Sequence, residues 1–452
     1  MSTVIIVQLV HTVIAAATAV KTWATLGSAF VIYKSLNLYF FGPLRHIPGP
    51  WWSRFTYIPY EITGFRGLID TYGAKLHAKY GPVVRIGPTQ VSIARNDDIR
   101  NILASYKHPK SKVYEINIVG VPDIFSTTDK ELNKKRRKQV GPAFSQTGLD
   151  SVEDLVLQVG ILSLKKKLDN EIRKAKGHYL FNYYSLFQSS ALDIIGELTL
   201  GKSFNAVEGG GHPIIEWIKS SIKLSVFKMI SPGLLSVPFF FKKFKKDKKK
   251  LIQYTADAIN SRKELISNNQ YNVDRIDILQ MYITAVNSNG SKLTEEEVMA
   301  EIIIMILAGA DTTSITMSWL LHFYTLYPQV HKKVVEEINQ HFPNKEQPIR
   351  YKEAQEKLVY FMATVYECMR LKPAVSGALP RESSSDGVKL LQDQIPADIQ
   401  LTLFIEGGNQ DPSVWESPRQ YIPERFLTEN GETLSKKLIT FSSGVRICPG
   451  KK

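Results

Sequence analysis

Cysteine is the rarest residue of this chain, which has only Cys368 and Cys448 among its 452 residues. Two thiols cannot build a disulfide framework or a cysteine-rich zinc module, and they fit a reducing compartment. The nine histidines show no metal-ligand spacing. The chain also lacks the short motifs of serine hydrolases, phosphate-binding loops and HExxH metalloproteases. These absences argue against each of those enzyme classes.

Acidic residues are absent from positions 1–41, which are otherwise largely apolar. A membrane helix needs ~20 apolar residues, so this stretch is long enough to cross a bilayer. Lys21 near its middle leaves open one tilted helix or two short segments. A cleaved signal peptide is disfavoured because the start lacks Lys or Arg. Arg45 and Arg54 follow the apolar block, so the positive-inside rule places the main body in the cytosol.

Low-complexity linkers and internal repeats are also missing. Residues 42–50 hold three prolines and two glycines, which predict a stiff hinge after the membrane anchor. The chain as a whole is 44% hydrophobic and 22% charged, as expected of a globular protein. We therefore predict a single domain over residues 51–452. The net charge of +14 suits an acidic partner or an anionic membrane surface.

The residue pattern predicts a mainly α fold with a small β region. Residues 83–86 and 91–93 indicate two strands around a turn, and the pattern from 129 to 326 is mostly helical. Thr294 with Glu297 forms a capping box, which predicts a long, apolar helix ending near Tyr327. A second helix is expected over residues 351–371.

An aromatic run, 238–241, precedes a lysine-rich run, 242–250. One interpretation is a solvated face beside a buried aromatic cluster. Another is a loop that inserts its aromatic residues into the membrane interface while lysines meet anionic head groups. Nucleic-acid binding is a third and weaker interpretation, because a single short run beside a membrane anchor is poor support for it.

The most informative segment lies near the end of the chain and follows the pattern F-x-x-G-x-R-x-C-x-G from Phe441 to Gly450. A thiolate that ligates iron needs a tight loop, which Gly444 and Gly450 would allow beside a flat cofactor. Phe441 would shield the sulfur of Cys448, and Arg446 would neutralise an anionic cofactor edge. A buried structural cysteine is the alternative, but the whole constellation is rare by chance.

These residues resemble the cytochrome P-450 superfamily of haem-thiolate monooxygenases, and the resemblance extends over nearly the whole chain. In its general style the chain is similar to membrane-anchored, microsomal, fungal members. The resemblance implies a triangular helical prism with a long central helix. It also implies haem b, iron protoporphyrin IX, with Cys448 as the axial ligand of the iron.

A second motif, Ala308-Gly309-Ala310-Asp311-Thr312, lies midway along the expected long helix. Small residues at Ala308 and Gly309 would allow close approach of a flat ring. A threonine can instead bond back to its own helix one turn earlier. The resemblance implies that Asp311 and Thr312 serve oxygen activation and proton delivery.

A third motif places Glu367 and Arg370 three residues apart, on one face of a helix. By itself, such a pair is more often a surface ion pair. The resemblance implies that Glu367, Arg370 and Arg425 form a buried structural network beneath the cysteine loop.

Further cations match the family by position. The resemblance implies that Arg381 and Arg137 meet the haem propionates. The family usually has an aromatic residue where Asn133 stands, four residues before Arg137.

The resemblance also implies an activity and its partners. We expect hydroxylation of a small lipophilic substrate, with electrons from an NADPH-cytochrome P-450 reductase. The expected location is the endoplasmic reticulum membrane, with the catalytic domain in the cytosol and no nucleic-acid partner.

One departure from the family is that the chain stops at Lys452, shortly after the cysteine loop. We therefore expect a truncated member that lacks the family's C-terminal helix and strands. Two alternatives stay open: a haem-poor, non-catalytic membrane protein, and an isomerase or dehydratase of the same fold.

Overall fold

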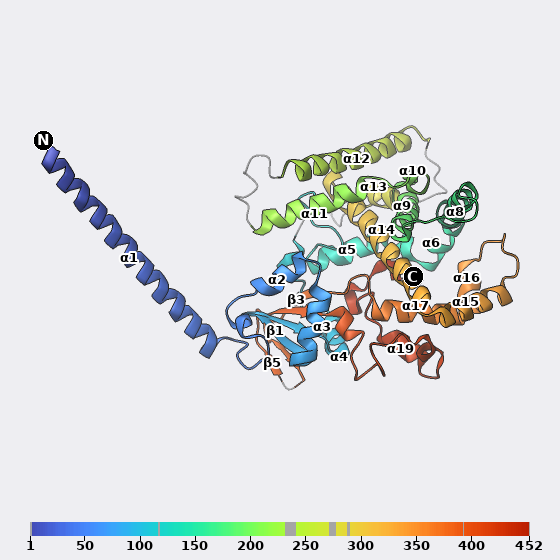
Figure 1. Ribbon diagram of the computed structural model, residues 1–452. Coiled ribbons are helices and arrows are strands. Elements are labelled where there is room, and N and C mark those ends of the chain that lie inside the picture. The colour runs from blue at the N-terminus through green and yellow to red at the C-terminus, as the bar shows by residue number, and fades with distance from the viewer. Residues whose placement is uncertain are drawn as a thin grey trace.

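The computed structural model describes residues 2–115, 118–230, 241–270, 277–286, 290–391 and 393–451, with the backbone alone for 2–21, 65 and 228–230. The fold is mainly helical, with one four-stranded and one two-stranded sheet (Figure 1). The expected fold class is therefore confirmed.

The N-terminal segment forms one continuous helix, α1, Ser2–Phe41. At 1.5 Å per residue this helix is about 60 Å long, and Figure 1 shows it projecting away from the body. Large apolar side chains such as Trp23, Phe30 and Phe41 are exposed along its second half. One helix, rather than two short segments, is the arrangement that the structure adopts.

The hinge residues 42–50 pack against the first strand. Leu44 and Ile47 are buried. The buried guanidinium of Arg85 donates hydrogen bonds to their carbonyl oxygens at 2.9 and 2.8 Å. The stiff turn is thus fixed to the sheet and directs α1 away from the body.

The larger sheet has the strand order β1-β2-β6-β3. The outer pairs are antiparallel and the central β2-β6 pair is parallel. A separate hairpin pairs β4 with β5. The strand bounds are β1 Val83–Gly87, β2 Gln90–Ile93, β3 Leu379–Glu382, β4 Val388–Leu390, β5 Asp393–Ile395 and β6 Gln400–Leu403. The two strands expected around residue 88 are therefore present.

The longest helix of the body is α14, Glu295–Leu326, and it begins with the expected capping box at Thr294. Among the helices whose side chains are described, α14 alone is long and apolar enough to cross a bilayer, but 56% of its most apolar window is buried. It is therefore a core helix. It packs along α9, Tyr183–Leu200, and lies in the largest hydrophobic cluster.

Other helices surround this core, and α11 lies beside α12 (Figure 1). Their bounds are α2 Ile58–Phe65, α3 Ile69–Tyr80, α4 Asn96–Leu103, α5 Lys130–Val140, α6 Gln146–Asp150, α7 Glu153–Val156, α8 Ser163–Lys174, α10 Ala206–Gly209, α11 Ile214–Ile230, α12 Lys242–Ser267, α13 Ile278–Thr284, α15 Pro328–His341, α16 Tyr351–Lys357, α17 Val359–Leu371, α18 Ile405–Gly408 and α19 Gly431–Lys437.

The prediction of one helix over residues 351–371 is wrong, because α16 and α17 are separated at Leu358. The carboxylate of Glu337 on α15 accepts hydrogen bonds from the backbone N–H groups of Tyr360 and Phe361, at 2.7 and 2.9 Å. It thereby caps a new helix start with a side chain from another helix, which no local pattern could show.

The aromatic and lysine-rich run falls partly outside the described residues, since 231–240 are not among them. Phe241 is buried and its ring packs near those of Phe227 and Phe244. Lys242 and Lys243 open α12 and are exposed. For the part described, the geometry is that of a solvated face beside a buried aromatic cluster.

Candidate functional site

The cysteine loop is shaped by its own backbone. The N–H of Cys448 donates to the carbonyl of Phe441 at 2.9 Å, and Ile447 N–H donates to Gly444 at 3.2 Å. Gly444 has φ +64°, and a Cβ there would lie 2.2 Å from the carbonyl oxygen of Leu103. A glycine is therefore required where the loop passes the end of α4.

Cys448 is a free and exposed residue near the end of this loop. Enough protein still surrounds its sulfur that desolvation raises the pKa of the thiol, while a backbone hydrogen bond from Gly450 and the charge of Arg137 act to lower it. Arg137 on α5 donates from Nη1 to the carbonyl of Ile447 at 2.8 Å. The cation thus holds the residue directly before the thiol.

The remaining cations expected at the cofactor are bound to neutral groups. Arg446 donates to the carbonyl oxygens of Thr127 and Thr128 at 3.0 and 3.2 Å. Arg381 is 3% exposed and donates to the carbonyl of Pro380 at 2.9 Å. Burial lowers the pKa of both guanidinium groups.

A further buried cation, Lys110, lies opposite Arg381 in an isolated antiparallel bridge. The sequence analysis did not identify it, because no motif surrounds Lys110 and it pairs with Arg381, 271 positions later in the chain. The proximity of Lys110 to Arg381 is visible only in the tertiary structure.

The charges of this region fit an anionic cofactor. Among the residues that the structure describes, no ion pair joins Lys110, Arg137, Arg381 or Arg446 to an acidic side chain, and the arginines donate to carbonyl oxygens. Buried charges are normally paired, because an unpaired one costs several kcal/mol. A flat group with carboxylates at its edge would supply a negative charge of the kind that these cations lack.

Asn133 does not leave a gap where the family has an aromatic residue. It is buried and donates to the carbonyl of Ile124 at 3.0 Å. It also accepts a hydrogen bond from the phenol of Tyr106 at 3.1 Å, and Arg446 lies over the Tyr106 ring at 5.2 Å. An aromatic ring from another segment therefore lies beside Arg446.

The central helix presents a polar stretch in its middle. Ala308 is exposed although most neighbouring positions are buried. The hydroxyl of Thr312 donates to the Ala308 carbonyl at 2.6 Å, which is the backbone bond expected as the alternative. A Cβ on Gly309 would meet Ile195 of α9 at 2.7 Å. This glycine therefore allows close packing of α9, whereas Ala308 faces open space.

Asp311 is held by side chains of two other helices. Its Oδ1 accepts a hydrogen bond from Gln188 of α9 at 2.6 Å, and Lys219 of α11 lies 3.8 Å from the same oxygen. Gln188 also donates to the hydroxyl of Tyr184 at 3.2 Å. The acid therefore has a fixed orientation and polar contacts toward α9 and α11.

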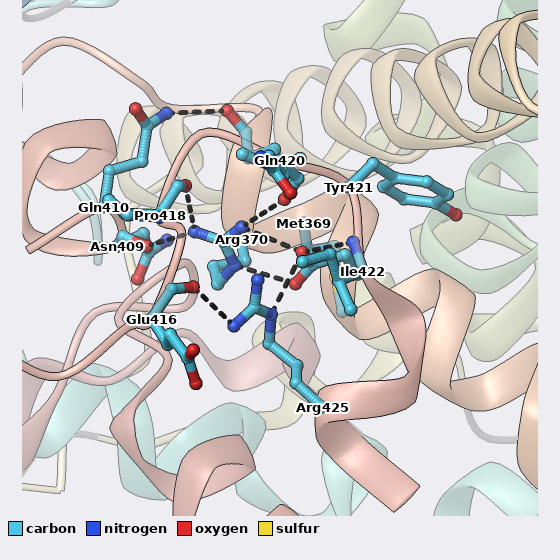
Figure 2. A network of polar contacts seen from close by, with 12 residues as sticks. Met369, Arg370, Asn409, Gln410, Glu416, Pro418, Gln420, Tyr421, Ile422 and Arg425 are labelled. Carbon is cyan, nitrogen blue, oxygen red and sulfur yellow. Dashed lines mark hydrogen bonds and ion pairs between the residues drawn. The ribbon is translucent and has the colours of Figure 1, made fainter. Parts of the chain in front are cut away.

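The third motif is a buried network (Figure 2). Glu367 and Arg370 are both 0% exposed. They form two parallel hydrogen bonds, at 2.7 and 2.8 Å. Arg425 donates from Nε to Glu367 at 3.2 Å. The backbone N–H of Ile422 adds a fourth donor to the same carboxylate at 2.9 Å.

Arg370 extends this network to the backbone of the segment before the cysteine loop. It donates to the carbonyl oxygens of Asn409, Pro418 and Gln420 at 3.0, 2.7 and 3.1 Å (Figure 2). The side chain of Asn409 donates to Thr440, next to Phe441, at 3.0 Å. The network therefore fixes the segment from which the cysteine loop begins.

Comparisons with known proteins agree with this arrangement. The family profile described as Cytochrome P450 matches residues 47–452. The cytochrome P450 monooxygenase helB1 of Aspergillus fumigatus is 32% identical over 425 residues, which are 93% of this chain and 72% of the relative. The cytochrome P450 monooxygenase FUS8 of Gibberella fujikuroi is 30% identical over 423 residues, 91% of this chain and 80% of the relative.

A solved structure shares the fold. The cyanobacterial CYP120A1 with bound retinoic acid superposes with a TM-score of 0.70 at 18% identity, covering 89% of this chain and 87% of that chain. Identity this low supports a shared fold and nothing about the ligand of this chain.

Proposed function

Because this chain belongs to the cytochrome P450 family and is a P450 monooxygenase, we propose that it hydroxylates a small lipophilic substrate with electrons from an NADPH-cytochrome P450 reductase. The family implies a haem-thiolate cofactor, which activates O2 when bound. The observation that carries the proposal is the exposed Cys448 next to the half-buried Arg446, whose charge interacts with that of the buried Arg381. Among the described residues, neither arginine forms an ion pair with an acidic side chain.

The residues around the cysteine loop have distinct binding roles in this proposal. The thiolate of Cys448 would ligate the haem iron. Arg381 and Arg446 would bind the haem carboxylates, and Arg137 positions the loop through Ile447. Phe441, Gly444 and Gly450 shape the loop; a Cβ on Gly450 would stay 3.9 Å from the sulfur.

Two residues of α14 handle protons. Asp311 carries a carboxyl whose orientation is fixed by Gln188. Thr312 carries a hydroxyl one position further along the helix. An acid next to an alcohol can move a proton from the polar contacts of α9 and α11 toward the open side of α14. This pair also favours oxygen chemistry over the isomerase or dehydratase alternative.

In this proposal the membrane holds the anchor and is where the chain meets its substrate and its reductase. The exposed apolar side chains of α1 support anchoring in the endoplasmic reticulum membrane, with the rest of the chain on the cytosolic side. A lipophilic substrate would be concentrated in that membrane. The net charge of +14 suits docking of an acidic reductase surface rather than a nucleic acid.

The first test is the reduced, carbon-monoxide difference spectrum of the full chain. We expect the strongly red-shifted Soret band of thiolate-ligated haem, lost in Cys448→Ser and kept in Cys368→Ser. Cys368 is a matched control, because it is the other cysteine and is buried against Thr316. No band in the wild-type chain would contradict the proposal and favour a haem-poor, non-catalytic protein.

The second test separates oxygen chemistry from isomerisation or dehydration. With reductase and NADPH, a lipophilic substrate should gain one atom of labelled oxygen from O2. Asp311→Asn keeps the acceptor for Gln188 but removes the acid, so the rate should fall by about 10²-fold. A product formed without O2 or NADPH would contradict a hydroxylation.

A further inference from the structure

Lys110 is placed by tertiary pairing and not by a local motif. The segment around it aligns antiparallel to β3, with a hydrogen bond from Glu382 N–H to the Pro109 carbonyl at 2.9 Å. This pairing sets Lys110 directly opposite Arg381. Residues opposite each other on paired strands have neighbouring side chains, and like charges there are unfavourable.

The ammonium of Lys110 is buried and has only neutral contacts. The residue is 8% exposed. Its Nζ donates to the carbonyl of Phe125 and lies 4.1 and 4.4 Å from the ring centres of Tyr114 and Phe125. Cation–π contacts of this kind offset only part of the cost of removing an ammonium from water, so the charged form of Lys110 is not compensated by them.

Nearby positive charges further disfavour the charged form of Lys110. Burial is the main cause that lowers the pKa of Lys110 to about 6 from 10.5, and the charges of Arg381 and Arg446 add to it. Asp123 is the acid that acts in the opposite direction. However, its Oδ1 accepts the backbone N–H groups of Phe125 and Ser126, both at 2.8 Å. Among the described residues, no ion pair reaches Lys110.

A negative charge from outside the chain would resolve this conflict. We propose that the Lys110 ammonium binds a carboxylate of the haem, together with Arg381. The inference rests on the proposed function, since it requires the haem that the family implies. It adds a contact that the sequence motifs do not predict. A carboxylate between the facing cations turns their repulsion into two charge-assisted hydrogen bonds.

The test compares haem with haem dimethyl ester, which lacks both negative charges. Lys110→Met keeps the length of the side chain and removes the charge; Lys112→Met is the matched control, because Lys112 is exposed two residues away. We expect Lys110→Met to weaken haem binding by about ten- to a hundredfold. Lys112→Met should have no effect. With the dimethyl ester, Lys110→Met and wild type should bind equally.

Different outcomes of the binding experiment would contradict different parts of the proposal. If wild type prefers haem to its ester but Lys110→Met binds haem equally well, Lys110 does not contact the carboxylate, and the proposed function stands. If Lys110→Met weakens both probes equally, the loss is structural and the inference is wrong. If wild type binds neither probe, both the proposed function and this inference fail.

Two further measurements guard against a folding defect. In the haem-free full chain, Lys110→Met should raise the unfolding midpoint, because folding then no longer buries an amine whose pKa is lowered from 10.5 to about 6. Lys110→Arg keeps the charge and should retain most of the haem affinity. A haem-free Lys110→Met chain that is less stable than wild type, or a Lys110→Arg chain as weak as Lys110→Met, would overturn the inference.

Discussion

The network at Glu367 and the cluster at Arg381 are both buried and both rich in arginine, yet their charges are balanced differently. The carboxylate of Glu367 accepts hydrogen bonds from Arg370, Arg425 and a backbone N–H. Its negative charge is therefore paired with positive charge inside the network. Arg381 faces Lys110, and no ion pair of the described residues contains either. The matched group has the charge balance expected of a structural support, and we propose that the unmatched group binds an anion.

Electrostatic free energy explains why this difference is informative. Removing charges from water is costly, and a well-connected pair offsets that cost only while both partners are present. A fold can tolerate unmatched buried cations if a ligand supplies the counter-charge in the working state. The two regions should therefore respond in opposite ways to the loss of one arginine.

The largest effect is expected in the matched network. Arg370→Met leaves Glu367 with fewer donors in a fully buried position. The free energy of unfolding should fall by about 3–5 kcal/mol, with or without haem. Chemical denaturation of the two forms measures it. A loss below about 1 kcal/mol would mean that the network does not contribute more to stability than a surface ion pair.

In the unmatched cluster, Arg381→Met should act on haem instead of on folding. We expect haem affinity to fall by about ten- to a hundredfold, while the haem-free chain loses no stability. Arg419→Met is the control, because Arg419 is exposed. The comparison would break if Arg381→Met destabilised the haem-free chain as strongly as Arg370→Met does.

A third buried group, around Glu301, has more acidic than basic side chains. It extends the comparison, because its contribution to the free energy of unfolding should depend on pH. Glu301 is 0% exposed, 3.2 Å from Arg136, and burial followed by the charge of Asp123 raises its pKa to about 8 from 4.5. Between these values the folded chain keeps a proton that the unfolded chain releases. Stability should therefore fall as pH rises, by at most about 1.4 kcal/mol per unit.

Unfolding measured between pH 5 and pH 9 tests this sign. Glu301→Gln should flatten the pH dependence, whereas Glu296→Gln should keep the wild-type slope, because Glu296 is exposed on the same helix. Identical slopes for wild type and Glu301→Gln would show that Glu301 is ionised in the folded chain.

The smallest effect is expected for a surface pair beside the matched network. Lys333 lies 2.8 Å from Glu424, whose sequence neighbour is Arg425, but the two side chains are 55% and 46% exposed. Lys333→Met should change the free energy of unfolding by less than about 1 kcal/mol, in low and in high salt. A loss comparable to that of Arg370→Met would mean that burial does not separate the two cases.

Much of the fold and the chemistry could be predicted from local patterns. The strands near residue 88 and the capping box at Thr294 depend on neighbouring residues, and the structure contains both. The cysteine loop is likewise a local motif. Its short spacing limits how the backbone can turn, so Cys448 and Gly444 could be named from the sequence.

Features that depend on distant segments could not be predicted. The break at Leu358 follows from a cap by Glu337 on another helix. Gly309 has the sequence context of a cofactor site, but the space beside it is filled by Ile195. The position of Lys110 opposite Arg381 depends on the pairing of its segment with a strand far away in the sequence. In each case a tertiary contact decides the role of the residue.

The most direct test of the difference between matched and unmatched charge is the stability of Lys110→Met/Arg381→Met with and without haem. We predict that the haem-free double variant unfolds at a higher temperature than the haem-free wild type. We also predict that haem raises its midpoint less than it raises that of wild type. A haem-free double variant that unfolds at a lower temperature would contradict the account, because the cations would then support the fold themselves.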